Sequence, residues 1–275
     1  MTMIQRSVPC LCGLVTMLLA LPAVAAERPL WELGLGAAAL RLPHYRGSDQ
    51  SHSWLLPAPY LVYRGEIFKA DRQGTRAVLF NSDRVDLDLS VAVSAPTRSR
   101  DNDARRGMAD LAPTFELGPN LNWTLARERH WKLDLRLPVR AVATIESRPR
   151  MLGWTATPNL NLDVADLGGW NLGVLAGPVL NGRRLNAYFY DVAPGVATAT
   201  RPAYASAGGY AGAQFITALS RRYTNSWAGL FVKFDTLRGA QFADSPLVRR
   251  RDNFAIGVAY SWVFATSSQT VDVPE

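Results

Sequence analysis

The sequence has few of the residues on which catalytic and metal sites depend. Its only cysteines are Cys10 and Cys12, both near the N-terminus. Its only histidines are His44, His52 and His130. Nucleophilic catalysis needs a base beside the nucleophile, and a zinc site needs about four ligands. Neither pattern occurs, and no glycine-rich phosphate loop stands between a strand and a helix. We therefore expect a protein that is not an enzyme and has no catalytic residues, no metal and no cofactor.

Long apolar runs are also scarce. The clearest one extends from Val8 to Val24, follows Arg6 and ends in small residues at Ala25 and Ala26. A basic residue, an apolar stretch and a small-residue cleavage site together form a secretory signal peptide. We predict such a signal over residues 1–26, cleaved after Ala26. Both cysteines fall inside it, so the mature chain has no thiol and no disulfide.

The chain is basic, with a formal net charge of +7, but long runs of basic residues are missing. The chain has 30 basic and 23 acidic residues, and no basic run is longer than Arg249-Arg250-Arg251. An exported chain without a basic helix is not expected to bind nucleic acid.

The sequence shows instead a strict alternation of apolar and polar residues. Between Arg84 and Ser94, apolar side chains occupy every second position, and the pattern recurs at 131–142 and 254–264. Successive side chains of a strand point to opposite faces, so each segment has one apolar and one polar face. Many segments of about ten residues, separated by turns, are typical of a transmembrane β-barrel. The predicted fold is an all-β, antiparallel transmembrane barrel in the cell outer membrane.

The alternation and the turn residues predict twelve strands. We place them at 31–41, 54–63, 66–72, 75–81, 84–94, 110–126, 131–143, 151–164, 169–180, 204–218, 222–236 and 252–264. The longer connections alternate with tight turns, as expected for long external loops and short periplasmic turns, except that the connection at 73–74 is short on the external side. The barrel then spans residues 27–264. Residues 265–275 form a polar tail that is predicted to be disordered.

Charged residues fall on the inward faces of neighbouring predicted strands. They are Asp86, Asp88, Glu116, Lys132, Asp134, Arg136, Arg140 and Asp163. Opposite charges on adjacent strands can pair across the interior. A structural lattice that fills the lumen is the favoured interpretation, because small barrels are filled by their own side chains. A narrow charged pore remains the alternative, since twelve strands give an intermediate width.

The predicted external loops are rich in arginine, including Arg249, Arg250 and Arg251. The outer leaflet that they would meet displays phosphorylated lipopolysaccharide, and arginine binds phosphate through a bidentate fork. Acidic residues such as Asp244 and Asp252 lie nearby, so a solvated loop surface is the competing interpretation. Both interpretations stay open.

Short blocks of sequence carry a resemblance to a known family. The blocks are Pro43–Ser48, Pro57–Tyr60, Tyr63–Glu66, Gly107–Leu111, Glu116–Pro119 and Tyr260–Phe264. In this order they resemble the MipA/OmpV family across nearly the whole mature chain. The resemblance implies an outer-membrane scaffold that joins a murein transglycosylase to a murein synthase and so serves peptidoglycan remodelling. Other members are immunogenic proteins linked to adhesion or osmotic adaptation. A narrow channel or an adhesin is therefore the alternative function.

The last predicted strand carries aromatic residues at every second position, at Tyr260, Trp262 and Phe264. The resemblance implies that this strand is the signal read by the outer-membrane assembly machinery. Such barrels usually end on the aromatic residue, whereas here eleven residues follow Phe264.

Overall fold

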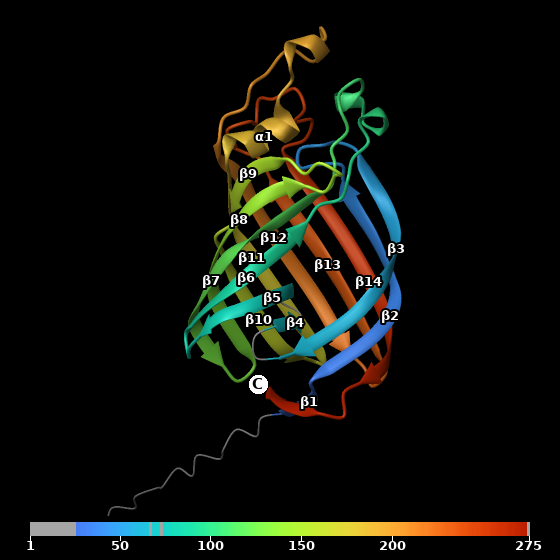
Figure 1. Cartoon of the computed structure of the whole chain (residues 1–275), viewed down its shortest axis with the longest axis vertical. Coiled ribbons are helices and arrows are strands. Elements are labelled where there is room, and N and C mark those ends of the chain that lie inside the picture. The colour runs from blue at the N-terminus through green and yellow to red at the C-terminus, as the bar shows by residue number, and fades with distance from the viewer. Residues whose placement is uncertain (1–25, 66–67, 72–73, 274–275) are drawn as a thin grey trace, which may run out of the picture.

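The computed structural model describes residues 26–65, 68–71 and 74–273, which form one closed antiparallel sheet and a two-stranded ribbon (Figure 1). The barrel strands are β2 (Trp31–Pro43), β3 (Ser51–Arg64), β4 (Phe68–Asp71), β5 (Gly74–Asn81), β6 (Val85–Val93), β7 (Thr114–Glu128), β8 (Trp131–Thr144), β9 (Met151–Ala156), β10 (Asn159–Leu167), β11 (Trp170–Asn181), β12 (Gly209–Arg222), β13 (Ser226–Thr236) and β14 (Asp252–Thr266). The ribbon pairs β1 (Ala26–Pro29) with β15 (Thr270–Val273).

The sheet has twelve strand positions. β9 and β10 both pair with β8 on one side and with β11 on the other, so they share one position that is interrupted at Thr157 and Pro158. A proline has no N–H to donate to a sheet, which explains the interruption. The barrel closes where β14 pairs with β2. The predicted fold and strand number are confirmed. Pro119 lies inside β7, which continues through it as predicted.

The two faces of the wall follow the alternation seen in the sequence. On β14, Phe254, Ile256 and Val258 are exposed, whereas Ala255 and Gly257 between them and Asn253 before them are buried. Apolar side chains therefore point outward and small or polar ones inward, which suits a wall in contact with lipid. No helix among the described residues is long and apolar enough to cross a membrane.

The two ends of the barrel differ in size. The ribbon and the short turns lie at one end, and the long loops lie at the other (Figure 1). The loops contain the helix α1 (Arg183–Tyr190) and three 3-10 helices, η1 (Ser99–Asp101), η2 (Asp103–Arg105) and η3 (Pro194–Val196). Residues 44–50, 94–113, 182–208 and 237–251 pack into one body, which we call the external cap. Its apolar core contains Tyr45, Leu111, Tyr190, Val192, Leu237, Phe242 and Leu247.

Three predicted strands begin too early, and two of these errors lie beside the cap, whereas the third concerns the strand predicted from residue 222, which begins at Ser226. The strand predicted from residue 110 begins at Thr114, and the one predicted from residue 204 begins at Gly209. Leu111 and Tyr204 belong to the external cap instead, where they pair with Thr97 and Val192. Their apolar side chains pack against the cap core, not against lipid.

The prediction of a disordered tail is wrong over most of its length. β14 continues to Thr266, and Thr270–Val273 forms β15. The partner strand β1 lies more than two hundred residues away in the chain, so local sequence gives no sign of the pairing. Residues 274–275 and nearly all of the predicted signal peptide lie outside the described residues.

Candidate functional site

The predicted inward charges form hydrogen-bonded pairs on one side of the lumen, which we call the charged wall (β6 to β10). Asp134, only 1% exposed, accepts a hydrogen bond from Thr124 and pairs with Lys132 at 3.1 Å and with Arg136 at 3.5 Å. Arg136 also reaches Asp163 on the next strand at 3.2 Å. Strand register brings these groups together, because Asp163 lies opposite Lys132 and Asn161 opposite Asp134.

A second group in the charged wall surrounds Arg140. Its Nε donates to Glu116 Oε2 at 2.9 Å, and its Nη1 donates to Ser90 Oγ at 3.1 Å. The guanidinium thus joins β8 to β7 and to β6. Asp88 accepts hydrogen bonds from Asn120 and Asn122. The charge of Glu116 is thus compensated by Arg140, whereas Asp88 is held by two neutral amides.

Asp86 is the exception among the eight predicted lumen residues. Its Oδ1 is buried and has no hydrogen-bond partner among the described residues. It lies in register with Asn122, whose amide donates to Asp88 instead.

Sequence reasoning missed two further ion clusters in the lumen. Glu32 on β2 accepts from Arg64 at 2.6 Å and from Arg222 at 2.8 Å, near the end that carries the ribbon. Asp235 on β13 pairs with Arg46 at 2.9 Å and with Lys233 at 3.2 Å, near the cap. The alternation did place Lys233 and Asp235 on one face of their strand, but their distant partners gave no signal.

Between the two ion clusters on β2, β3 and β13 lies a group of large apolar and aromatic side chains, which we call the aromatic wall (Leu40, Tyr60, Trp227 and Phe231). The rings of Tyr60 and Trp227 lie 5.8 Å apart. Glycines beneath these side chains make room for them, since a Cβ at Gly229 would overlap the Trp227 ring and one at Gly257 would overlap Phe231 and Leu40. The lumen therefore contains the charged wall and, on the other side, aromatic side chains with an ion cluster toward each end of the barrel.

The external cap closes the upper mouth of the barrel with a packed core. The rings of Tyr190 and Phe242 stack with centroids 3.7 Å apart, and Phe242 is fully buried. Burial raises the pKa of Tyr45 to about 12 and also raises the pKa of Tyr190. Both phenols donate to backbone carbonyls, Tyr45 to Leu247 and Tyr190 to Arg46. The loops are thus fastened to one another by buried hydrogen bonds.

Two buried arginines hold the cap loops by backbone contacts. Arg105 donates to the carbonyls of Phe189 at 3.0 Å and Ala109 at 3.2 Å. Arg201 donates to the carbonyls of Ala104 and Val196. Burial lowers the pKa of Arg105.

The histidines His44 and His52 make contacts within or beside the cap. His44 Nδ1 lies 3.0 Å from Asn102 Nδ2, and its ring centroid lies 6.4 Å from that of His52. Burial, and then the neighbouring His52, lowers the pKa of His44. Among the residues that the structure describes, no group of three His, Cys, Asp or Glu side chains is placed to hold a metal ion.

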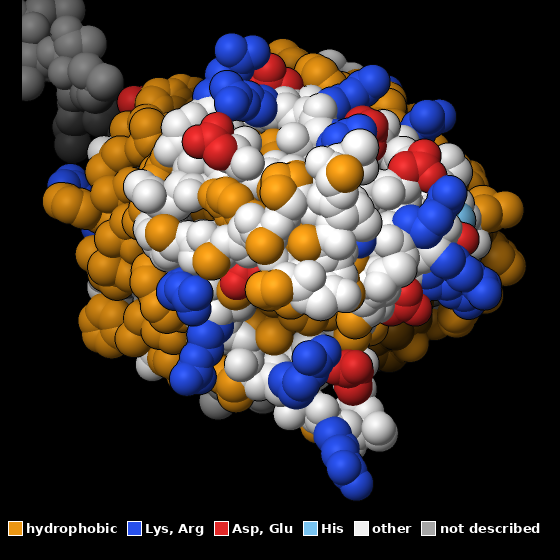
Figure 2. Space-filling model, turned by 90° about the horizontal axis from the view of Figure 1, so that it is seen from above, with side chains coloured by type: hydrophobic (Ala, Val, Ile, Leu, Met, Phe, Trp, Pro, Cys, Tyr) orange, Lys and Arg blue, Asp and Glu red, His pale blue; other side chains and the backbone are white. Residues whose placement is uncertain are grey.

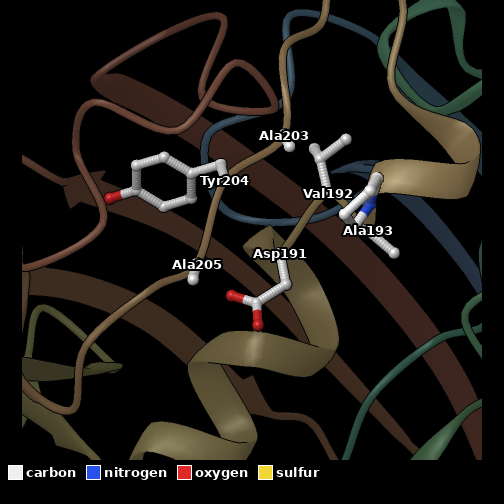
Figure 3. Close-up of a pocket in the computed structure, with 7 residues that line it drawn as sticks. Asp191, Val192, Ala193, Ala203, Tyr204 and Ala205 are labelled. Atoms are coloured by element: carbon white, nitrogen blue, oxygen red, sulfur yellow. The ribbon is translucent and has the colours of Figure 1, made fainter.

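A hollow in the cap is lined by Asp191, Val192, Ala193, Pro194, Ala203, Tyr204 and Ala205 (Figure 3). The Asp191 carboxylate is its main charged group, and it accepts hydrogen bonds from the Ser206 N–H and hydroxyl, both at 2.6 Å. The carboxylate therefore holds the loop in place, and the alanine side chains around it have no polar groups that could bind a ligand.

Arg249, Arg250 and Arg251 lie at the surface of the cap, and all three are exposed. The N–H groups of Arg249 and Arg250 donate to the Gly47 carbonyl, so the backbone is held while the side chains extend outward. Lysine and arginine side chains gather around the periphery of the external face, with polar and apolar groups nearer its centre (Figure 2).

The aromatic residues of the last strand all point outward. Tyr260, Trp262 and Phe264 are between 57% and 61% exposed, and they lie on the face of β14 that contacts lipid. The strand is paired along its length with β13 and β2.

Solved barrels of low sequence identity are similar to this chain. An outer-membrane channel from Pseudomonas putida F1 is 14% identical, with a TM-score of 0.43, over 87% of this chain and 97% of that one. Outer membrane phospholipase A from Escherichia coli is 11% identical, with a TM-score of 0.33, over 86% and 94% of the two chains. The CymD monoaromatic hydrocarbon channel is 9% identical, with a TM-score of 0.33, over 86% and 89%. No curated protein matches the sequence.

A family profile, by contrast, matches most of the chain. Residues 35–264 match the family described as MltA-interacting protein MipA. The match begins within β2 and ends at Phe264 in β14, so it covers nearly the whole barrel and the cap. It confirms the resemblance drawn from the sequence blocks. The chain belongs to the MipA family, and it is an outer-membrane β-barrel protein.

Proposed function

We propose that this protein is a non-catalytic scaffold that binds a murein transglycosylase, and through it a murein synthase, at the periplasmic end of the barrel. The family description names an interaction with MltA, and this supports a binding role. The observation that carries the proposal is the β1–β15 ribbon. Short turns alone offer little surface, whereas the ribbon adds paired backbone to that end.

The ribbon is fastened to the barrel rim. Arg64 Nη1 donates to the Pro29 carbonyl at 2.7 Å, while the same side chain pairs with Glu32. The Leu30 N–H donates to the Gln269 carbonyl at 2.9 Å. A partner that binds the ribbon therefore meets a surface held in place by the barrel, which lowers the ordering cost of binding.

The other end of the barrel favours binding over conduction. The cap core is continuous across the loops and fully buries Leu237, Phe242 and Leu247. A route straight through the barrel would have to unpack this core. The charged wall then serves as the structural filling of the lumen.

The test is recovery of partners from mildly solubilised envelopes with the tagged protein. Selective recovery of a murein transglycosylase, compared with an unrelated barrel, is the expected result. A variant that ends after Thr266 lacks β15 and should lose the partner. The matched control, Arg249, Arg250 and Arg251 to Ala at the opposite end, should retain it.

Heat-dependent mobility on a denaturing gel shows whether each variant has folded. Recovery of no murein enzyme by a folded wild-type barrel would contradict the scaffold role. Hydrolysis of lipid by the purified barrel would contradict the non-catalytic role.

A further inference from the structure

Two adjacent arginines at the periplasmic end of β12 have different surroundings. Arg222 points into the lumen, where its Nε donates to Glu32 Oε2 at 2.8 Å. Neighbouring side chains of a strand point to opposite faces, so Arg221 points outward, toward lipid. Within the described part of the chain, the Arg221 side chain donates to no oxygen and forms no ion pair, although it contacts two aromatic rings. Its positive charge is therefore left without a compensating group.

The guanidinium of Arg221 lies against these two rings. Its Cζ is 5.0 Å from the ring centroid of Tyr223 and 5.9 Å from that of Trp170, at the start of the neighbouring strand β11. Gly169 leaves room for the side chain, because a Cβ at this position would lie 3.1 Å from Cζ. A planar guanidinium stacks on aromatic faces and still presents its N–H groups at its edge. The rings thus orient a set of donors that has no acceptor in the protein.

The turns that carry the two rings are fixed by hydrogen bonds. Arg222 Nη1 donates to the carbonyl of Tyr223 and, at 2.7 Å, to that of Thr224. In the turn before Trp170, the Gly169 N–H donates to Asp166 Oδ1 at 3.0 Å. The carboxylate of Asp166 is therefore engaged by its own turn, and it forms no ion pair with Arg221. Fixed turns lower the ordering cost of binding a ligand.

The other arginines that lie over aromatic rings already have acceptors. Arg105, over Tyr45, donates to backbone carbonyls, and Arg150, over Tyr188, pairs with Glu146. Their ring contacts belong to the internal packing of the protein. Arg221 differs because its donors remain available to a ligand from outside.

The outward face of β12 changes from apolar to charged at Arg221. Phe215 and Leu219 precede it on the same face, and Leu219 lies opposite Leu172 of β11. Apolar side chains of a barrel wall contact acyl chains, and aromatic rings are enriched where the acyl chains meet the headgroups. The ring contacts therefore indicate that Arg221 lies at the headgroup level of the periplasmic leaflet. In an outer membrane this leaflet consists of glycerophospholipids.

We propose that Arg221, held by Trp170 and Tyr223, binds the phosphate diester of a glycerophospholipid in the periplasmic leaflet. The guanidinium donates to two phosphate oxygens through its planar fork. Leu172 and Leu219 lie two residues, or roughly 7 Å, closer to the bilayer centre, where they contact the acyl chains of the same lipid.

An acidic segment of a partner protein is the less suitable ligand. It can present a carboxylate to the same guanidinium, but Arg221 points outward from the wall and continues its apolar lipid-facing surface. The inference does not depend on the scaffold role, because it concerns the outer wall and not the ribbon.

The test is native mass spectrometry of the whole barrel released from detergent micelles, with dioleoylphosphatidylglycerol as the probe. The wild-type barrel should retain the lipid. Arg221→Gln should lower the bound fraction about ten-fold, because one charged hydrogen-bonding group is lost. Arg127→Gln, which removes an exposed arginine from the β7–β8 turn at the same end, is the matched control and should retain the lipid.

Dioleoylglycerol has the same acyl chains without the phosphate, so the wild-type barrel should retain it poorly. Equal retention of the two lipids would overturn the proposal, and so would phosphatidylglycerol binding that Arg221→Gln leaves unchanged. Displacement of the lipid by inorganic phosphate would assign the site to a free anion and overturn the lipid ligand. Loss of a co-purified envelope protein in Arg221→Gln, with lipid binding unchanged, would assign the guanidinium to a protein partner instead. Gel mobility shows that each variant has folded.

Discussion

Buried arginines have different partners in the external cap and in the lumen. In the cap, Arg105 and Arg201 are buried beside an apolar core and donate to backbone carbonyls. In the lumen, Arg136 and Arg140 pair with carboxylates, and the apolar side chains point outward. The cap is organised like a water-soluble domain, with its apolar groups inside. The barrel has the reverse order, because lipid is its solvent.

The two regions therefore differ in the interactions that stabilise them. Loops carry many backbone groups that need partners, so the cap uses arginines as multiple donors to carbonyls. Strands already satisfy their backbone groups, so the lumen needs only charge compensation between side chains. Substitutions in one region at a time test whether the cap and the lumen are stabilised independently.

The largest expected effect follows the removal of the cap core. Phe242→Ala leaves a cavity next to Tyr190 and should destabilise the cap by about 3–5 kcal/mol. The barrel strands should remain folded, because their pairing does not involve Phe242. Hydrogen exchange of loops 182–208 and 237–251 measures the loss, with gel mobility as the control. Simultaneous loss of the barrel would show that the two regions fold as one unit.

Removal of a lumen arginine should have a smaller effect. Arg140→Ala removes donors to Glu116 and Ser90, and its expected cost is about 1–3 kcal/mol because these groups lose charged hydrogen bonds. Denaturant titration in micelles measures it. Arg150→Ala is the matched control, since its pair with Glu146 is exposed and should cost little. Equal effects of the two variants would refute the charge-compensation role of the lumen lattice.

Acid should loosen the cap before the barrel. The lowered pKa of His44 means that the folded protein binds this proton less readily than the unfolded chain does. Stability from the neutral ring is therefore present above pH 6.5, the ordinary value, and is lost as the pH falls toward the lowered pKa. Protonation also removes the acceptor that Asn102 uses. Hydrogen exchange of residues 44–50 at pH 7.5 and 5.5 measures this loss.

His44→Gln should remove most of this pH dependence. An unchanged dependence in the variant would assign the effect to another group.

The smallest effect on folding is expected at the cap surface. Replacing Arg249, Arg250 and Arg251 by Ala should change stability by less than about 0.5 kcal/mol, because the side chains are exposed. We propose that these arginines bind lipopolysaccharide phosphates, so co-purified lipopolysaccharide should fall. Arg127→Ala, at the opposite end, is the control. Unchanged lipopolysaccharide in the triple variant would show that this loop is only solvated.

The strands were predictable because alternation reports directly which face meets lipid. The same signal fails at Leu111 and Tyr204, whose apolar side chains pack into the cap and so imitate strand residues. Helix α1 carries apolar residues that pack within the cap, and its eight residues are too few to give a periodic pattern in the sequence.

The lumen was predictable only in part. Pairs between neighbouring strands, such as Arg140 and Glu116, follow from register and alternation. The cluster of Glu32, Arg64 and Arg222 joins β2 and β3 to β12 and depends on barrel closure, which the local sequence does not encode.

The terminal ribbon also bears on how the barrel closes. The first and last barrel strands, β2 and β14, meet only after the whole chain has been made, and contacts so distant in sequence form slowly because of loop-closure entropy. β1 precedes β2 and β15 follows β14, so their pairing continues the same seam. Once β1 has paired with β15, or β2 with β14, the strands of the other pair are held close together. The entropic cost of bringing that second pair into contact therefore falls. The ribbon is thus a clasp that favours closure and opposes unzipping of the finished barrel from its periplasmic edge.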